Sequence, residues 1–131
     1  MNRKISARIA AVLLVLHGFI EVSGLFALKY MSASLVSFGG MDQTQIDENI
    51  TSIAALGIFW SLTRFGAAWG TWSLRKWGLA LGITMSLVTM VAAVTVIPAG
   101  VTDTLIAGLV LAFLLYTWFG NQALEIMKEQ S

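Results

Sequence analysis

The chain has 131 residues, of which 57% are hydrophobic and 11% are charged, and its formal net charge at pH 7 is +1. A soluble domain carries about a quarter charged residues, so this composition excludes a water-soluble surface and predicts an all-α integral membrane protein. The small net charge gives no reason to expect nucleic-acid binding. The absence of cysteine excludes disulfides, thiolate metal ligands and a cysteine nucleophile.

Four apolar segments are long enough to cross a bilayer, which takes about 20 mainly apolar residues. They predict a single domain, a four-transmembrane-helix bundle with spans near residues 9–28, 53–74, 77–97 and 104–124 and an external loop at 29–52. Gly39-Gly40 and the polar run that follows are typical of a loop. Asp42 and Gln45 have the spacing of a capping box, however, so a helix could begin there and continue into the second span.

The first span follows a basic segment, and a cleaved secretory signal shows the same pattern. The long apolar stretch, its polar residues His17 and Glu21, and Lys29-Tyr30 where small residues would precede cleavage all favour a span that is retained.

Three ionisable residues lie within the expected spans, where each costs roughly 2.5 to 3.5 kcal/mol to insert. His17 and Glu21 are four residues apart and share one face of the first span, whereas Arg64 lies near the middle of the second. These two spans run in opposite directions, and side chains lean toward the N-terminus of their own helix. We therefore expect Glu21 and Arg64 to meet in a charge-assisted pair, which could be structural or functional. His17 could be a hydrogen-bonded core residue or could relay a proton to Glu21.

Other kinds of site have less support. His17 and Glu21 could supply two metal ligands, but the spans contain no second histidine and no further carboxylate, so neither a metal nor another cofactor is expected. The serines are scattered and lack a nucleophile elbow. We assign no catalytic residues, although an enzyme that acts on lipid with His17 and Glu21 as acid and base stays an alternative.

Small residues four apart predict where helices approach closely in lipid. The second span carries Gly66 and Gly70, and the third carries Gly78, Gly82 and Ser86. We expect these two spans to form a tight antiparallel hairpin. Gly108 and Ala112 repeat the spacing in the fourth span.

The basic residues predict the orientation. With four spans both termini lie on one side, which would carry Arg3, Lys4, Arg8, Arg75, Lys76 and Lys128, against Lys29 alone on the other. Basic residues favour the cytoplasmic side, so both termini should be cytoplasmic, in a cell inner or plasma membrane. Three interfacial tryptophans, Trp72, Trp77 and Trp118, support the same side.

The segment Gly18 to Tyr30, G-F-I-E-V-S-G-L-F-A-L-K-Y, resembles the first span of the small multidrug resistance transporters. In that family a glutamate followed by valine lies eight residues before a lysine and an aromatic residue, as Glu21-Val22 and Lys29-Tyr30 do here. The family's short four-span chains work as dimers, and the resemblance implies that Glu21 exchanges protons for cationic substrates.

The rest of the chain departs from that family. It has no counterpart of the aromatic-rich third-span motif, its first external loop is longer, and its basic residues are too asymmetric for dual orientation. Arg64 would also compete with a cationic substrate for Glu21.

Two functions of different classes follow. The first is a proton-coupled carrier of small molecules, in which Glu21, His17 and Arg64 bind proton and substrate. The alternative is a non-catalytic subunit or accessory protein of a membrane complex, in which the same residues form a structural clasp. The expected partners are the lipid bilayer and either a second copy of the chain or another membrane protein.

Overall fold

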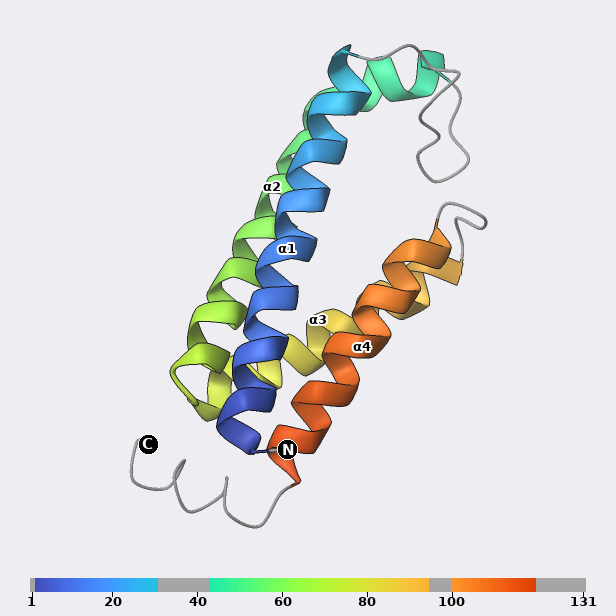
Figure 1. The fold of residues 1–131 in the computed structure, drawn as a ribbon. Helices are drawn as coiled ribbons and strands as arrows, with labels where there is room; N and C mark the ends of the chain where they lie inside the picture. Colours follow the sequence, from blue (N-terminus) through green and yellow to red (C-terminus); the bar gives the residue numbers. More distant parts are fainter. Residues whose placement is uncertain (1, 31–42, 95–99, 120–131) are drawn as a thin grey trace.

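The described part of the chain is helical almost throughout. The computed structural model describes residues 2–30, 43–94 and 100–119. They form the helices α1 (Arg3–Tyr30), α2 (Gln43–Trp72), α3 (Lys76–Val94) and α4 (Gly100–Trp118) (Figure 1). All four are long and apolar enough to cross a membrane. An all-helical fold with four segments capable of spanning a bilayer is therefore confirmed.

The helix ends differ from the edges of the apolar segments. α1 begins at Arg3 rather than near residue 9, and α4 begins at Gly100 rather than near 104. The predicted ends of the third and fourth spans, at 97 and 124, lie outside the described residues. α2 begins at Gln43, so residues 43–52 of the predicted loop are helical and continue into the second span. Hydropathy marks where a chain is apolar, whereas a helix can continue into polar sequence beyond the bilayer. The proposed cap Asp42 lies outside the described residues.

The helices alternate in direction around a ring. α1 packs against α2 and α4, and α3 packs against the same two helices. The start of α1, the turn at residues 73–75 and the end of α4 lie at one end of the bundle (Figure 1), which we call the terminal end. We call the opposite end, where α1 and α2 extend beyond the shorter α3 and α4, the loop end.

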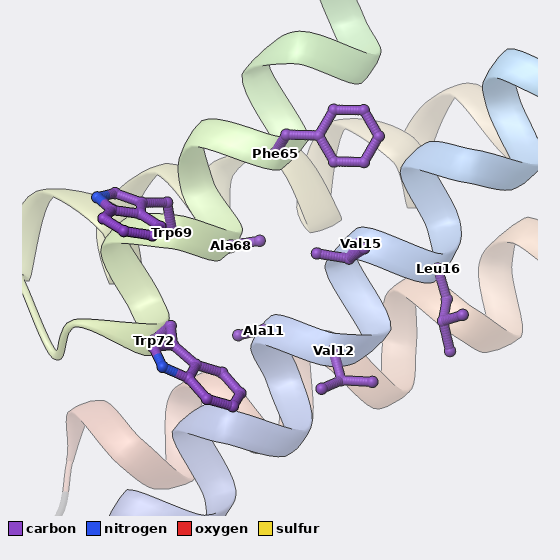
Figure 2. A pocket seen from close by; sticks show the side chains of 8 residues that line it. All are labelled: Ala11, Val12, Val15, Leu16, Phe65, Ala68, Trp69 and Trp72. Atoms are coloured by element: carbon purple, nitrogen blue, oxygen red, sulfur yellow. The ribbon is translucent and has the colours of Figure 1, made fainter.

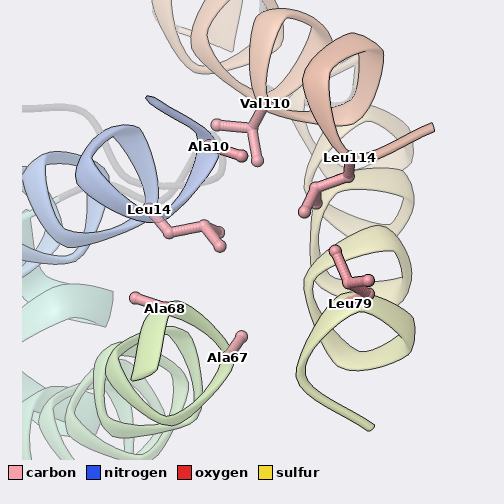
Figure 3. Close-up of a cluster of buried hydrophobic side chains, with 7 residues drawn as sticks. All are labelled: Ala10, Leu14, Ala67, Ala68, Leu79, Val110 and Leu114. Carbon is pink, nitrogen blue, oxygen red and sulfur yellow. The ribbon is translucent and has the colours of Figure 1, made fainter. Parts of the chain in front are cut away.

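The core of the bundle takes small and aliphatic side chains from all four helices. It contains Ala10, Leu14, Ala67, Ala68, Leu79, Val110 and Leu114 (Figure 3). The outward faces are also apolar, and large side chains such as Trp69 and Val91 are about 70% exposed. Such a surface suits a bilayer, because a helix in lipid satisfies its own backbone hydrogen bonds and can leave apolar side chains outside.

A Schellman motif closes the turn between α2 and α3. The amide of Arg75 donates to the Gly70 carbonyl oxygen at 2.9 Å, and that of Leu74 to the Thr71 carbonyl oxygen at 3.0 Å. Leu74 has a φ of 55°, the left-handed conformation that this motif requires. The turn reverses the direction of the chain between α2 and α3 (Figure 1).

The closest approach of α2 and α3 is at Gly70 and Gly78. A Cβ atom added at Gly70 would lie 2.6 Å from the Cα of Gly78, and one added at Gly78 would overlap the backbone of Gly70. The other predicted packing glycines lie elsewhere. A Cβ at Gly82 would contact Leu114 of α4 at 2.9 Å, and a Cβ at Gly66 would meet no described residue outside its own helix within 4 Å. Two crossing helices approach most closely at one point, and here that point lies beside the turn.

Candidate functional site

A polar cluster with a member from each helix lies inside the apolar bundle. It consists of His17 and Glu21 of α1, Arg64 of α2, Thr89 of α3 and Asp103 of α4, which are joined by the contacts described below. Thr89 lies 13 residues after the start of α3 and Asp103 lies 15 residues before the end of α4. At about 1.5 Å per helical residue both are about 20 Å from the terminal end, so the cluster lies toward the loop end.

Arg64 is the centre of the cluster. Its side chain is fully buried, and it binds Glu21 through two parallel hydrogen bonds. Nε donates to Oε2 at 2.8 Å and Nη2 donates to Oε1 at 2.7 Å. This bidentate arrangement is the strongest geometry available to an arginine and a carboxylate. The expected contact between Glu21 and Arg64 is present.

Two of the three remaining guanidinium N–H groups reach Thr89 of α3 and His17 of α1. Nη2 also donates to Oγ1 of Thr89 at 2.7 Å, and Nη1 lies 3.1 Å from Nδ1 of His17. A guanidinium has no acceptor atom, so Nδ1 of His17 must accept this hydrogen bond. The proton of a neutral His17 ring is then on Nε2, which makes the tautomer a consequence of Arg64.

His17 joins α4 to the cluster through Asp103. Nε2 of the buried ring lies 3.4 Å from Oδ1 of Asp103 but forms no hydrogen bond with it. The two groups are therefore adjacent rather than tightly bonded. Among the described residues, no hydrogen bond joins His17 directly to the Glu21 carboxylate. The two side chains are linked through Arg64, which contacts both.

Two carboxylates and one guanidinium leave the cluster with one uncompensated negative charge when His17 is neutral. The carboxylates are also its least buried members. The side chain of Glu21 is 23% exposed and that of Asp103 is 45% exposed, whereas the side chains of His17 and Arg64 are 0% exposed. The cluster thus has a closed cationic centre and two partly open anionic ends.

Thr89 and Asp103 were not among the expected site residues. Asp103 lies one residue before the predicted span at 104–124, but α4 begins at Gly100 and places it in the first helical turn. The expectation that no carboxylate besides Glu21 belongs to the spans is therefore wrong for Asp103. An acidic residue at a helix N-terminus is favoured by the helix dipole. The position of Asp103 just before an apolar segment was therefore a sequence signal that the helix begins there.

Comparison with known proteins finds no matching protein-family model, no matching curated protein and no matching solved structure. In the described ranges 2–30, 43–94 and 100–119, no three His, Asp or Glu side chains are grouped so that they could hold a metal ion.

Proposed function

We propose that the protein is a non-catalytic membrane protein, an accessory protein or subunit, in which the polar cluster clasps four transmembrane helices together. The observation that carries this proposal is the bidentate bond between Glu21 and the fully buried Arg64. Removing one partner of a buried ion pair typically costs about 3 to 5 kcal/mol, because the other charge is left uncompensated. A pair of this kind is suited to staying closed.

A carrier would have to open the same pair in every cycle. A cationic substrate that used Glu21 would displace Arg64, and the guanidinium would lose both of its ionic hydrogen bonds without access to water. This energetic argument favours a clasp over exchange at Glu21.

The proposed orientation has both termini in the cytoplasm and the bundle in a cell inner or plasma membrane. Its support is the charge distribution: Arg3, Lys4, Arg8, Arg75 and Lys76 lie at the terminal end, where Trp72 and Trp77 are also half exposed. Asp47 and Glu48 lie near the start of α2 at the loop end.

The orientation can be tested because the chain has no cysteine. A single cysteine in place of Thr102, which is exposed near the loop end, should react with a membrane-impermeant maleimide in intact cells. A cysteine in place of Asn2 should react only after lysis. The opposite pattern would reverse the proposed orientation.

A proton-coupled carrier is the second candidate. It is favoured by the partial exposure of Glu21 and Asp103 and by the one negative charge that the cluster leaves uncompensated, which a proton or a cationic substrate would neutralise. The resemblance of the segment around Glu21 to the small multidrug resistance transporters points the same way. The carrier predicts that ethidium drives proton release from proteoliposomes and that Glu21→Gln abolishes it.

A charge swap tests the clasp. Glu21→Arg alone and Arg64→Glu alone should each lower the thermal stability of the detergent-solubilised protein, because each places two like charges together in the bundle. The double variant should recover a substantial part of the loss. If the double variant is no more stable than either single variant, and Glu21 is required for ethidium-driven proton release, the clasp is replaced by the carrier.

A further inference from the structure

An apolar groove runs along the outer surface between α1 and α2, on the terminal side of the polar cluster. It has a volume of about 350 Å³ and takes four lining residues from each helix (Figure 2). Val12 and Leu16 form one side, and Phe65, Trp69 and Trp72 form the other. Ala11 and Ala68 lie at the floor, where both are nearly fully buried. The small floor residues are what make the surface concave.

The groove ends at a basic side chain. The guanidinium of Arg8 lies over the ring of Trp72, 5.4 Å from its centroid, and Trp72 itself lines the groove. Arg8 precedes Val12 by four residues, and Lys4 precedes Arg8 by four, so these residues continue the same stripe of α1 toward the terminal end. The apolar groove therefore leads to a basic region around Arg8, which we call its mouth.

Within the described part of the chain, every charged side chain at this mouth is basic. The described acidic residues are Glu21 and Asp103 in the polar cluster and Asp47 and Glu48 in the first turns of α2, and none of them lies at the terminal end. Arg8 is exposed and forms no ion pair with any described residue. A molecule that fits the groove and its mouth needs an apolar chain attached to an anionic head.

The length of the groove matches part of one leaflet. Phe65 and Trp72 are two helical turns apart, about 10 Å, whereas half of a hydrocarbon core about 30 Å thick is about 15 Å. A single acyl chain could lie along the groove with its glycerol and phosphate level with Arg8.

We infer that this groove is a binding site for one anionic phospholipid, with an acyl chain against Trp69 and Phe65 and the phosphate at Arg8. The inference is independent of the clasp, because none of the groove residues belongs to the polar cluster. A lipid suits this site because an apolar groove that leads to a cationic mouth matches an acyl chain joined to an anionic head; a second copy of this chain would bring the same kind of mouth and be repelled.

Native mass spectrometry of the full chain, titrated in detergent with phosphatidylglycerol or with phosphatidylcholine of the same acyl chains, tests the site. The wild-type chain should retain one phosphatidylglycerol at concentrations at which phosphatidylcholine is not retained. Arg8→Gln should weaken phosphatidylglycerol retention about fivefold, the effect of one basic side chain at an anionic headgroup. Soluble glycerol 3-phosphate should not compete, because it lacks the acyl chain.

Two matched controls accompany these variants. Arg3→Gln removes the same charge from the same helix, but Arg3 lies about 140° around α1 from Arg8 and faces Tyr116 of α4, with its guanidinium 5.9 Å from the ring centroid. It should leave retention unchanged. Val12→Phe should fill the groove and abolish retention, whereas Val91→Phe on an exposed face of α3 should not. Circular dichroism checks that every variant is as helical as the wild type.

Four outcomes would overturn the inference. Equal retention of the two lipids would show a general lipid shell, and equal losses in Arg8→Gln and Arg3→Gln would show attraction by diffuse charge. Unchanged retention in Val12→Phe, or a dimer that this variant dissociates while lipid binding persists, would assign the groove to another occupant.

Discussion

Nη1 of Arg64 lies 3.1 Å from Nδ1 of His17, and this contact holds the histidine ring between α2 and α4. The ring faces Arg64 through one nitrogen and Asp103 through the other. A histidine in this position accepts one of the four hydrogen bonds that the buried guanidinium donates.

His17→Asn should therefore be tolerated better than His17→Leu. The amide oxygen of asparagine can replace Nδ1 as an acceptor, whereas leucine leaves Nη1 of Arg64 without its neighbour in a buried site. An unsatisfied buried donor costs about 1 to 3 kcal/mol, so the leucine variant should be less stable than the asparagine variant by about that amount. Chemical denaturation in detergent measures the difference. Equal stability of the two variants would contradict a hydrogen-bonding role for the ring.

Thr89→Val should destabilise the bundle because Nη2 of Arg64 loses an acceptor while the shape of the side chain is kept. The expected loss is again about 1 to 3 kcal/mol in the free energy of unfolding. Thr84→Val is the matched control, since the Thr84 hydroxyl is exposed and donates only to the Ala80 carbonyl oxygen within α3. If both variants lose the same stability, the contact with Arg64 contributes nothing specific.

Gly78→Ala should be among the more damaging single-methyl changes in the chain. The added Cβ would overlap the backbone of Gly70, so the two helices would have to separate, and overpacking of this kind costs about 1 to 3 kcal/mol. Gly66→Ala adds the same methyl group to open space in α2. It should be neutral or stabilising by up to about 1 kcal/mol, because alanine is the better helix former. Thermal unfolding of both variants distinguishes this arrangement from one in which every small-residue ridge packs equally.

The contact between Glu21 and Arg64 could be predicted from the sequence, because both residues lie in apolar segments whose directions alternate. Asp103 was missed, because hydropathy does not show where the helix begins and the residue lies just outside the apolar run. Nothing in the sequence indicated that Thr89 belongs to the site. Threonines in apolar helices commonly bond to their own backbone, as Thr84 and Thr104 do, and nothing in the sequence marks the one that turns to a guanidinium.

The spacing of glycines likewise predicted the hairpin but not its point of closest approach. Gly66 and Gly70 share a face of α2, and only the crossing geometry of two packed helices decides that Gly70 meets α3. Helical periodicity fixes which residues share a face; the tilt of one helix against another does not follow from it.

A double-mutant cycle with Glu21→Gln, Arg64→Met and their combination measures whether Glu21 and Arg64 form a closed pair. The measured quantity is the free energy of unfolding in a fixed detergent. Glu21→Gln should cost about 3 to 5 kcal/mol, because it leaves the fully buried Arg64 guanidinium uncompensated, and Arg64→Met should cost less because the carboxylate that it leaves is 23% exposed. The double variant should lose clearly less than the sum of the two single losses. Additive losses, within about 0.5 kcal/mol of that sum, would contradict the clasp.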